Sequence, residues 1–515
     1  SYDGSMGVQS VYKNLKMLRR NGYVSTADAM GATYVDAGND TDFPQSITRT
    51  GLVQNHHVAF SGGTEQSNYR ASLGVMDNRM VIRTTSFNNF VAKLDIAQKA
   101  FDDLLAIDFG VFGSSQNDHD IFDVQKLFYS AAAQNPTYHA GQNDGGGWDK
   151  NPNASQINPP HALLHEKNDE RMLYFNTHLR FAATLSRDLT LTLFGSYSYN
   201  STENAQFCPT WVWAQGQAIR GEQKSEDWLG NATLDYRHTW DIHHLSLTAL
   251  GEYQKQRMRG FFTTVKGFTT NSFGYDNLAA ASTRPYGGTG SSYQAPALGS
   301  VMGSASYTLM DRYTASVTVR GDGSSMVGEN NTWGLFPSVS AEWNIKSEPF
   351  MHAVTWLDQL KLRTGWGESG NLGGISSYNS LQLMTPTGVV SVNGSPTVTM
   401  GFIRNANPDL KWETRSTFNI GADMGVLGNR IVLTAEYYSS KTRDMLYLYD
   451  VPVPPYAYEK LLANIGSMSN SGFEIGLGAA PIQKKDMELN VNVNVSWQKQ
   501  RQGDDEDLAI FKYNE

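Results

Sequence analysis

Three features are scarce in this sequence: cysteine, long apolar runs and clustered positive charge. Cys208 is the single cysteine among 515 residues, so neither an internal disulfide nor a thiolate metal cluster can form. No run of about 18 apolar residues occurs, which excludes a membrane protein built from helices. The formal net charge is -9 and the sequence has no basic stripe, so we exclude a nucleic-acid partner.

An export signal is also missing. The chain begins at Ser1 without Met, a charged stretch or an apolar segment, so we expect any signal peptide to have been removed or to lie upstream. The mean hydropathy is -0.42, but alternating strands give only a weak hydropathy signal. Composition therefore leaves a membrane β-barrel open.

Residues 488–498 carry the pattern on which the prediction of fold rests. Leu489, Val491, Val493, Val495 and Trp497 alternate strictly with Glu, Asn, Ser and Gln residues. A period of two places the two sets on opposite faces of a strand. A row of asparagines suits neither a sandwich core nor a helix, whereas an outer-membrane barrel has lipid outside and water inside. The segment predicts a barrel strand with an apolar and a polar face.

The same alternation recurs along the chain in about 17 segments, each expected to supply roughly 9 to 11 residues that cross a bilayer at a tilt. The segments cover residues 1–11, 58–60, 69–75, 90–96, 105–112, 173–185, 189–199, 228–240, 245–253, 298–309, 313–320, 336–345, 360–366, 418–424, 431–437, 473–477 and 488–498. Short helices are expected at residues 12–21 and 118–134. The predicted fold is all-β, a transmembrane antiparallel β-barrel with residues 1–515 as one domain.

The connections between these segments alternate in length. Tight connections are expected at residues 62–67, 99–103, 186–188, 241–243, 310–312 and 427–429, and long ones at 116–170, 201–226, 258–296, 370–411 and 447–467. Outer-membrane barrels have short periplasmic turns and long outward loops, whereas a soluble sandwich has no reason to sort its loops. With residues 1–11 as a first strand rising from the periplasm, the last strand ends outside. A bacterial barrel cannot close that way, so we expect a fragment whose final strands are missing.

Several phrases of the sequence resemble the barrel of SusC/RagA-type TonB-dependent transporters. They are VQNHHV (53–58), SGGTE (61–65), RGDGSSM (320–326), LFPSVSAEW (335–343), LKLRTGWGESGN (360–371), NPDLKWE (407–413), NIG (464–466) and NSGFEI (470–475). They are spread over nearly the whole chain in the order found in that family. Phrases such as DGSS and NPDL also read as ordinary turns, so they report the fold and not a binding site.

The resemblance implies a bacterial outer-membrane barrel of about 22 strands whose lumen is filled by an N-terminal plug. It also implies a SusD-like surface lipoprotein that covers the barrel as a lid and captures oligosaccharides or peptides. Energy would come from the TonB complex through the plug. We expect the plug, the TonB box and the last strands to lie outside these residues.

No catalytic constellation stands out in the sequence. His165 and Glu166 lack the second His of a zinc-protease helix. Residues 149–153 open like a calcium loop, but Ala154 replaces the required glycine. We therefore predict neither an enzyme nor a cofactor or metal site.

Two long connections combine Trp with small or polar side chains, in Trp148-Asp149 and in Trp211 with Trp213. Such aromatics suit stacking on sugar rings or burial beneath a partner. The alternatives are a loop that packs on itself and an aromatic girdle at the lipid interface.

The polar faces carry a second set of candidates, His178, Arg180 and Arg320. We expect these side chains to contact water, the plug or solute in transit. An energised importer is favoured by the family resemblance. A passive porin, or a surface-exposed binding or adhesion barrel, remains the alternative, because the residues alone do not separate them.

Overall fold

The computed structural model describes residues 1–13, 15–150, 158–484 and 486–502. In this part of the chain a 19-stranded antiparallel sheet forms, together with a separate two-stranded hairpin. The sheet strands are β1 (Tyr2–Gln9), β2 (Gly51–Gly63), β3 (Ser67–Arg79), β4 (Ser86–Ala100), β5 (Leu105–Asp120), β6 (Lys167–Ser186), β7 (Leu189–Cys208), β8 (Gln217–Trp240), β9 (His243–Phe268), β10 (Ala281–Thr283), β11 (Thr289–Gln294), β12 (Ala297–Leu309), β13 (Tyr313–Ser324), β14 (Trp333–Asn344), β15 (Leu357–Asn371), β18 (Glu413–Val426), β19 (Ile431–Asp450), β20 (Lys460–Lys484) and β21 (Met487–Gln502).

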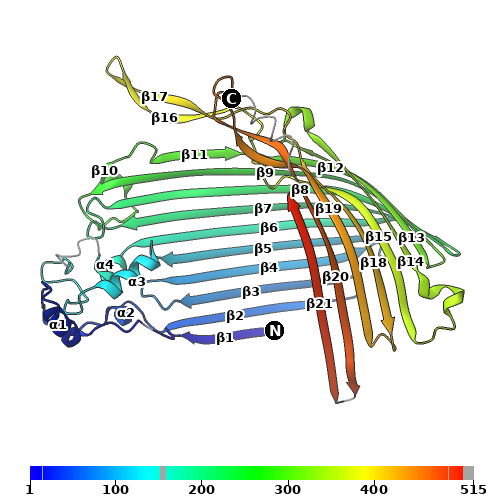
Figure 1. Ribbon diagram of the computed structural model, residues 1–515, viewed down its shortest axis with the longest axis horizontal. Helices are drawn as coiled ribbons and strands as arrows, with labels where there is room; N and C mark the ends of the chain where they lie inside the picture. The colour runs from blue at the N-terminus through cyan, green and yellow to red at the C-terminus, as the bar shows by residue number, and fades with distance from the viewer. Residues whose placement is uncertain (14, 151–157, 485, 503–515) are drawn as a thin grey trace.

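The sheet is a single wall in which, apart from β10 and β11, each strand pairs with the next wall strand along the chain. The short strands β10 and β11 pair with β9 beside the start of β12, and the other strands of the wall coincide one for one with the predicted segments. In Figure 1 strands β2–β8 run across the view while β18–β21 cross it steeply, so the wall is strongly curved. The hairpin of β16 (Leu383–Val392) and β17 (Ser395–Arg404) projects from it and was not predicted.

Except for β1, the strands that match predicted segments are longer than predicted. Apart from the short β10 and β11, the strands of the wall run from 8 residues in β1 to 26 in β9, and every other wall strand after β1 has at least 12. The predicted loop at 201–226 was wrong for the same reason, because β7 extends to Cys208 and β8 begins at Gln217. Alternation of hydrophobicity marks only the part of a strand with one apolar face, whereas the ladder of backbone hydrogen bonds continues beyond it.

The connections alternate between the two ends of the wall as predicted. Tight turns, such as the three residues between β12 and β13, form one end, which we call the short-turn rim. Met310 and Asp311 in that turn both have positive φ, 55° and 54°, and close the hairpin within three residues. The other end carries the long connections at residues 10–50, 121–166, 269–296 and 372–412, and we call it the long-connection rim.

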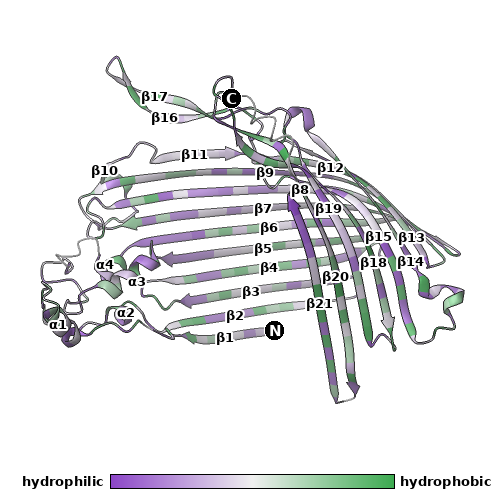
Figure 2. Ribbon diagram, viewed as in Figure 1, coloured by the Kyte–Doolittle hydropathy of each residue, from purple (hydrophilic) through white to green (hydrophobic). Residues whose placement is uncertain are grey.

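The two faces of the wall differ in chemistry. Large apolar side chains lie exposed along one face, including Val491, Val493 and Val495 at 42%, 46% and 59% exposure. The opposite face is polar, and hydrophobic and hydrophilic residues alternate along the strands in Figure 2. We call these the outer and inner faces. The apolar residues of the wall are therefore not enclosed in a core between two sheets.

Aromatic rings gather on the outer face close to the short-turn rim. Trp240 stacks on His243 with ring centroids 5.3 Å apart, and His243 in turn stacks on Tyr307 at 6.0 Å. On the neighbouring strands Tyr313 stacks on Trp343 at 6.4 Å. Bands of Tyr and Trp mark the lipid headgroup level in membrane barrels. Among the described residues no helix is long and apolar enough to cross a membrane.

The buried clusters lie in the long-connection rim, where connections pack on one another. The largest joins the connection at residues 10–50 to the one at 121–166 and includes Phe43, Ile47, Leu127 and Leu163. The helices of these connections are α1 (Arg20–Ala29), α2 (Phe43–Ser46), α3 (Val124–Ala133) and α4 (Pro160–Leu163). The prediction for 118–134 is thus confirmed in its second half, since β5 continues to Asp120. The helix predicted at 12–21 was wrong, because the helix runs from Arg20 to Ala29.

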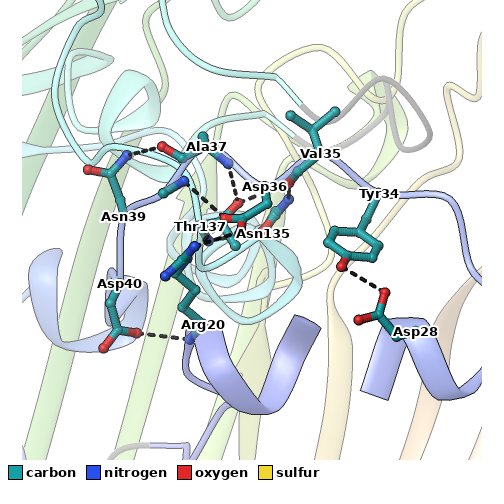
Figure 3. Close-up of polar contacts among 11 residues, drawn as sticks. Arg20, Asp28, Tyr34, Val35, Asp36, Ala37, Asn39, Asp40, Asn135 and Thr137 are labelled. Atoms are coloured by element: carbon teal, nitrogen blue, oxygen red, sulfur yellow. Dashed lines mark hydrogen bonds and ion pairs between the residues drawn. The ribbon is translucent and has the colours of Figure 1, made fainter. Parts of the chain in front are cut away.

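Hydrogen bonds between these two connections hold the rim together (Figure 3). The backbone oxygen of Val35 accepts from Asn135 Nδ2 at 2.8 Å and from Thr137 Oγ1 at 3.0 Å. Arg20 pairs with Asp36 at 2.7 Å and holds the pKa of that carboxyl below its usual value, chiefly through the hydrogen bond. Residues about 100 positions apart in sequence are thereby fixed side by side.

Candidate functional site at the long-connection rim

The predicted tryptophans Trp148 and Trp211 come together around a residue that the sequence did not single out as a contact, His165. The His165 ring lies 5.5 Å from the ring of Trp148 and 5.8 Å from that of Trp211. His165 is exposed in part, and the partial removal of its ring from water lowers its pKa. Both indole nitrogens are buried and lack a hydrogen-bond partner within the described residues. An aromatic cluster therefore joins the connection at residues 121–166 to the connection between β7 and β8.

Asp149 is engaged with its own connection. Its carboxylate accepts from the backbone nitrogen of His139 at 3.4 Å and from Asn143 Nδ2 at 3.5 Å, and its backbone oxygen accepts from Gln134 Nε2 at 3.3 Å. This arrangement matches the alternative in which the loop packs on itself. Asn151 and Asn153 of the calcium-like phrase lie outside the described residues, and in the described part of the chain no three His, Cys, Asp or Glu residues gather to hold a metal ion.

Trp213 is the most accessible of the three predicted tryptophans. Its side chain is 39% exposed, and Lys266 Nζ lies 4.7 Å from the ring centroid, within cation–π range. It borders a cleft of about 530 Å³ in which the connection between β7 and β8 faces α3 and the start of β6. The lining residues are Phe122, Lys126, Asn158, Glu166, Cys208, Val212, Trp213 and Gln217.

Glu166 is the buried acid of this cleft. Its side chain is 6% exposed, its Oε1 accepts from the Cys208 thiol at 3.8 Å, and its Oε2 has no partner among the described residues. Removal from water raises the pKa of Glu166, while nearby Lys126 acts in the opposite direction. Sequence reasoning named Glu166 only as part of an incomplete zinc motif. Its burial depends on α3, some forty residues earlier, and no local signal shows it.

The register places this cleft on the inner face. Cys208 pairs directly with Gln217, so both side chains lie on one face of the wall. Gln206, two residues before Cys208, bonds to Asn168 Oδ1 at 2.8 Å on the same face. Following β6 by steps of two from Asn168 leads to His178 and Arg180. The cleft therefore opens at the mouth of the surface that carries the polar candidates.

The polar candidates themselves lie apart from the cleft. Twelve residues separate His178 from Glu166 in sequence, about 40 Å along a strand at roughly 3.3 Å per residue. His178 stacks on Phe194 at 6.1 Å, and Arg180 pairs with Asp108 at 2.7 Å. The structure does not bring these residues into one site with the tryptophans.

Arg320 is held in a network on the inner face of β13. Its guanidinium contacts Asp322 at 2.9 Å, Glu252 at 3.4 Å and Ser300 Oγ at 2.9 Å. A guanidinium with three partners is fixed in orientation and contributes a positioned charge to the inner surface. Two carboxylates already balance that charge, so this network is not a ready-made anion site.

Comparison with known proteins identifies the family of this chain. The family model described as TonB dependent receptor-like, beta-barrel matches residues 108–512. This chain belongs to that family. TonB-dependent receptor SusC of Bacteroides thetaiotaomicron is 29% identical over 528 residues, covering 94% of this chain and 51% of the relative. TonB-dependent receptor P3 of Formosa agariphila is 29% identical over 510 residues, covering 94% of this chain and 49% of the relative. The chain thus spans about half the length of these curated relatives.

Solved structures share the barrel fold. The structure titled as the RagAB peptide transporter aligns with a TM-score of 0.79 and 19% identity, covering 97% of this chain and 61% of that chain. The siderophore receptor PirA from Pseudomonas aeruginosa aligns with a TM-score of 0.50 and 14% identity, covering 87% and 63%. The resemblance to SusC/RagA-type barrels is confirmed. Membership of a receptor family also agrees with the prediction that the TonB-dependent barrel is not an enzyme.

Proposed function

We propose that this barrel is the wall of an outer-membrane importer, energised through TonB, that takes up oligosaccharides or oligopeptides together with a SusD-like surface lipoprotein. The proposal depends mainly on one observation: the wall, which belongs to the TonB-dependent receptor family, has an apolar outer face and a polar inner face. Apolar side chains such as Val317 and Val493 meet lipid on the outer face. Charged networks such as that of Arg320 line a hydrated passage on the inner face.

The proposal includes closure of the wall by further strands to about 22, with a plug inside. Within the described residues β1 pairs with β2 alone and β21 with β20 alone, so each has a free edge that a further strand would cover. An uncovered strand edge inside a bilayer would leave backbone groups without hydrogen-bond partners. The same proposal assigns residues 1–515 to this barrel domain and turns the long-connection rim toward the cell exterior.

At that rim we assign cargo and lid contact to the aromatic connections. The sequence similarity to SusC and the fold shared with the RagAB peptide transporter support an importer that a lipoprotein covers as a lid. They leave open whether the cargo is a glycan or a peptide. Trp213 offers an accessible ring, and the cluster of Trp148, His165 and Trp211 fixes the two connections beside it. Arg180 and Arg320 would then meet solute or plug deeper in the passage.

The experiment is an uptake assay with the full-length protein in its native host. Labelled oligosaccharides and oligopeptides are supplied to wild-type cells, to cells without TonB, and to cells without the lipoprotein that copurifies with the barrel. The proposal predicts accumulation that is lost in both deletions. Uptake that persists without TonB, or a barrel that copurifies with no surface lipoprotein, would contradict it and favour the passive porin.

A further inference from the structure

The cleft at Glu166 has the components of a small-ligand site. Its volume of about 530 Å³ falls within the roughly 300 to 1,000 Å³ of typical ligand pockets. Glu166 lines the cleft and is more than nine-tenths buried, and its Oε2 has no hydrogen-bond partner among the described residues. A buried polar oxygen left unpaired is costly, which indicates that something else supplies its hydrogen bond.

The lining also presents donors and an aromatic ring. With the Asn158 amide oriented to satisfy its neighbours, its oxygen accepts from Lys126 Nζ at 3.1 Å, so the ammonium is held at the cleft. Gln217 lies on the inner face beside Cys208 and contributes an amide. Trp213 forms an apolar side of the same cleft. Hydrogen-bond donors, hydrogen-bond acceptors and the Trp213 ring therefore line the same cleft.

The charges around the cleft restrict the ligand. A cation would meet Lys126, and Lys266 already lies over the Trp213 ring at 4.7 Å. An anion would meet the Glu166 carboxyl at close range. A neutral ligand with several hydroxyl groups and an apolar ring face avoids both penalties, because hydroxyls donate and accept while ring C–H groups pack on an indole.

We propose that this cleft is a subsite for one end of a neutral oligosaccharide, with Trp213 stacking on a sugar ring and Glu166 bonding its hydroxyls. The inference rests on the proposed import function and narrows its cargo to neutral glycans. Its position on the inner face, above the strand that carries His178 and Arg180, places the bound sugar at the entrance of the passage.

The test uses the full-length protein purified in detergent and isothermal titration with maltotriose, cellotriose and mannotriose. Trilysine, triglutamate and trialanine represent charged and peptide ligands. We expect at least one neutral trisaccharide to bind, and Trp213→Ala to weaken it about tenfold or more, as for a stacked aromatic anchor. Trp333→Ala removes another exposed tryptophan of the same rim, outside the cleft, and should leave affinity unchanged.

Glu166 is tested by two substitutions, each checked for folding by heat-modifiable gel migration. Glu166→Ala should weaken sugar binding about tenfold, whereas Glu166→Gln keeps a hydrogen-bonding group and should change it by roughly threefold or less. A loss of similar size in Glu166→Gln would show that an amide cannot replace the carboxyl group, and would overturn the hydrogen-bonding role assigned to Glu166. The subsite would also be overturned if any peptide bound more tightly than the trisaccharides, if no trisaccharide bound, or if Trp213→Ala bound the trisaccharide as tightly as the wild type.

Failure of this inference is distinguishable from failure of the proposed function. TonB-dependent uptake without trisaccharide binding would overturn the subsite and leave the importer in place. Trisaccharide binding that depends on Trp213, combined with uptake that persists without TonB, would overturn the importer and leave the subsite.

Discussion

A lysine placed at Val317 tests whether the outer face meets lipid. Val317 lies on β13 and is 52% exposed on that face. Tyr313, four residues earlier, stacks on Trp343 in the aromatic band near the short-turn rim. At roughly 3.3 Å per residue and a tilt of about 40°, Val317 lies about 10 Å from the band. That depth is near the middle of an apolar belt about 25 Å tall.

Lysine at the midplane of a barrel's lipid face costs about 2 to 4 kcal/mol, so Val317→Lys should lower the folding equilibrium constant about 30-fold or more. The matched control is Thr318→Lys on the inner face. It removes the hydrogen bond to Ser304, 2.8 Å long, for about 1 kcal/mol, and places its ammonium in water. The difference between the two variants should therefore be about 1 to 3 kcal/mol, with Val317→Lys the less stable.

The assay is urea titration of the full-length protein folded into phosphatidylcholine vesicles, followed by heat-modifiable gel migration. Both variants carry the same added charge on adjacent residues, so differences in net charge cancel. Equal free energies of unfolding for the two, or a larger cost for Thr318→Lys, would refute the assignment of the faces.

Further predictions concern the rim and the inner face. Glu166→Gln should stabilise the rim at about pH 8 and not at about pH 4, because burial raises the pKa of Glu166 and the folded state loses stability as pH rises through that pKa. Equal protection of the α3 amides from hydrogen exchange in the variant and the wild type at about pH 8 would contradict this. Asp36→Asn should speed amide exchange of residues 34–40 relative to the wild type at neutral pH, but not at a pH below the lowered pKa of Asp36. Arg20 lowers that pKa, so the stability that the Arg20–Asp36 pair contributes is lost as pH falls through it. Arg180→Ala should cost no more than about 1 kcal/mol, as its pair with Asp108 is 44% and 37% exposed; a larger loss in urea titration would indicate a structural role.

Much of the wall was predictable because lipid and water impose a period of two on each strand. Every predicted segment, from the weak one at residues 1–11 to the strong one at 488–498, is a strand of the wall. Lengths were not predictable, because β8 and β9 continue into the rim beyond the stretch in which apolar and polar residues alternate. In the predicted helix at residues 12–21, Tyr12, Leu15 and Leu18 recur at helical spacing. All three are exposed, so packing does not stabilise a helix there, and the helix begins at Arg20.

The candidate site was predictable only in its aromatic part. Trp148, Trp211 and Trp213 stand out in the sequence because large rings are unusual among small and polar loop residues. That two of them pack on His165 depends on how separate connections meet. Glu166 gained its burial from α3 and the end of β7, contacts between residues far apart in sequence that no local pattern encodes.

The most direct test of the two-faced wall is cysteine scanning along β13 in outer-membrane vesicles of cells that make the full-length protein. Single cysteines replace residues 314–320 in a Cys208→Ser background, and each is labelled with a lipid-soluble or a water-soluble maleimide. Residues 315, 317 and 319 should react with the lipid-soluble reagent, and residues 314, 316, 318 and 320 with the water-soluble one. Labelling without this alternation, or water-soluble labelling at 317 and 319, would contradict a wall with lipid on one side and a passage on the other.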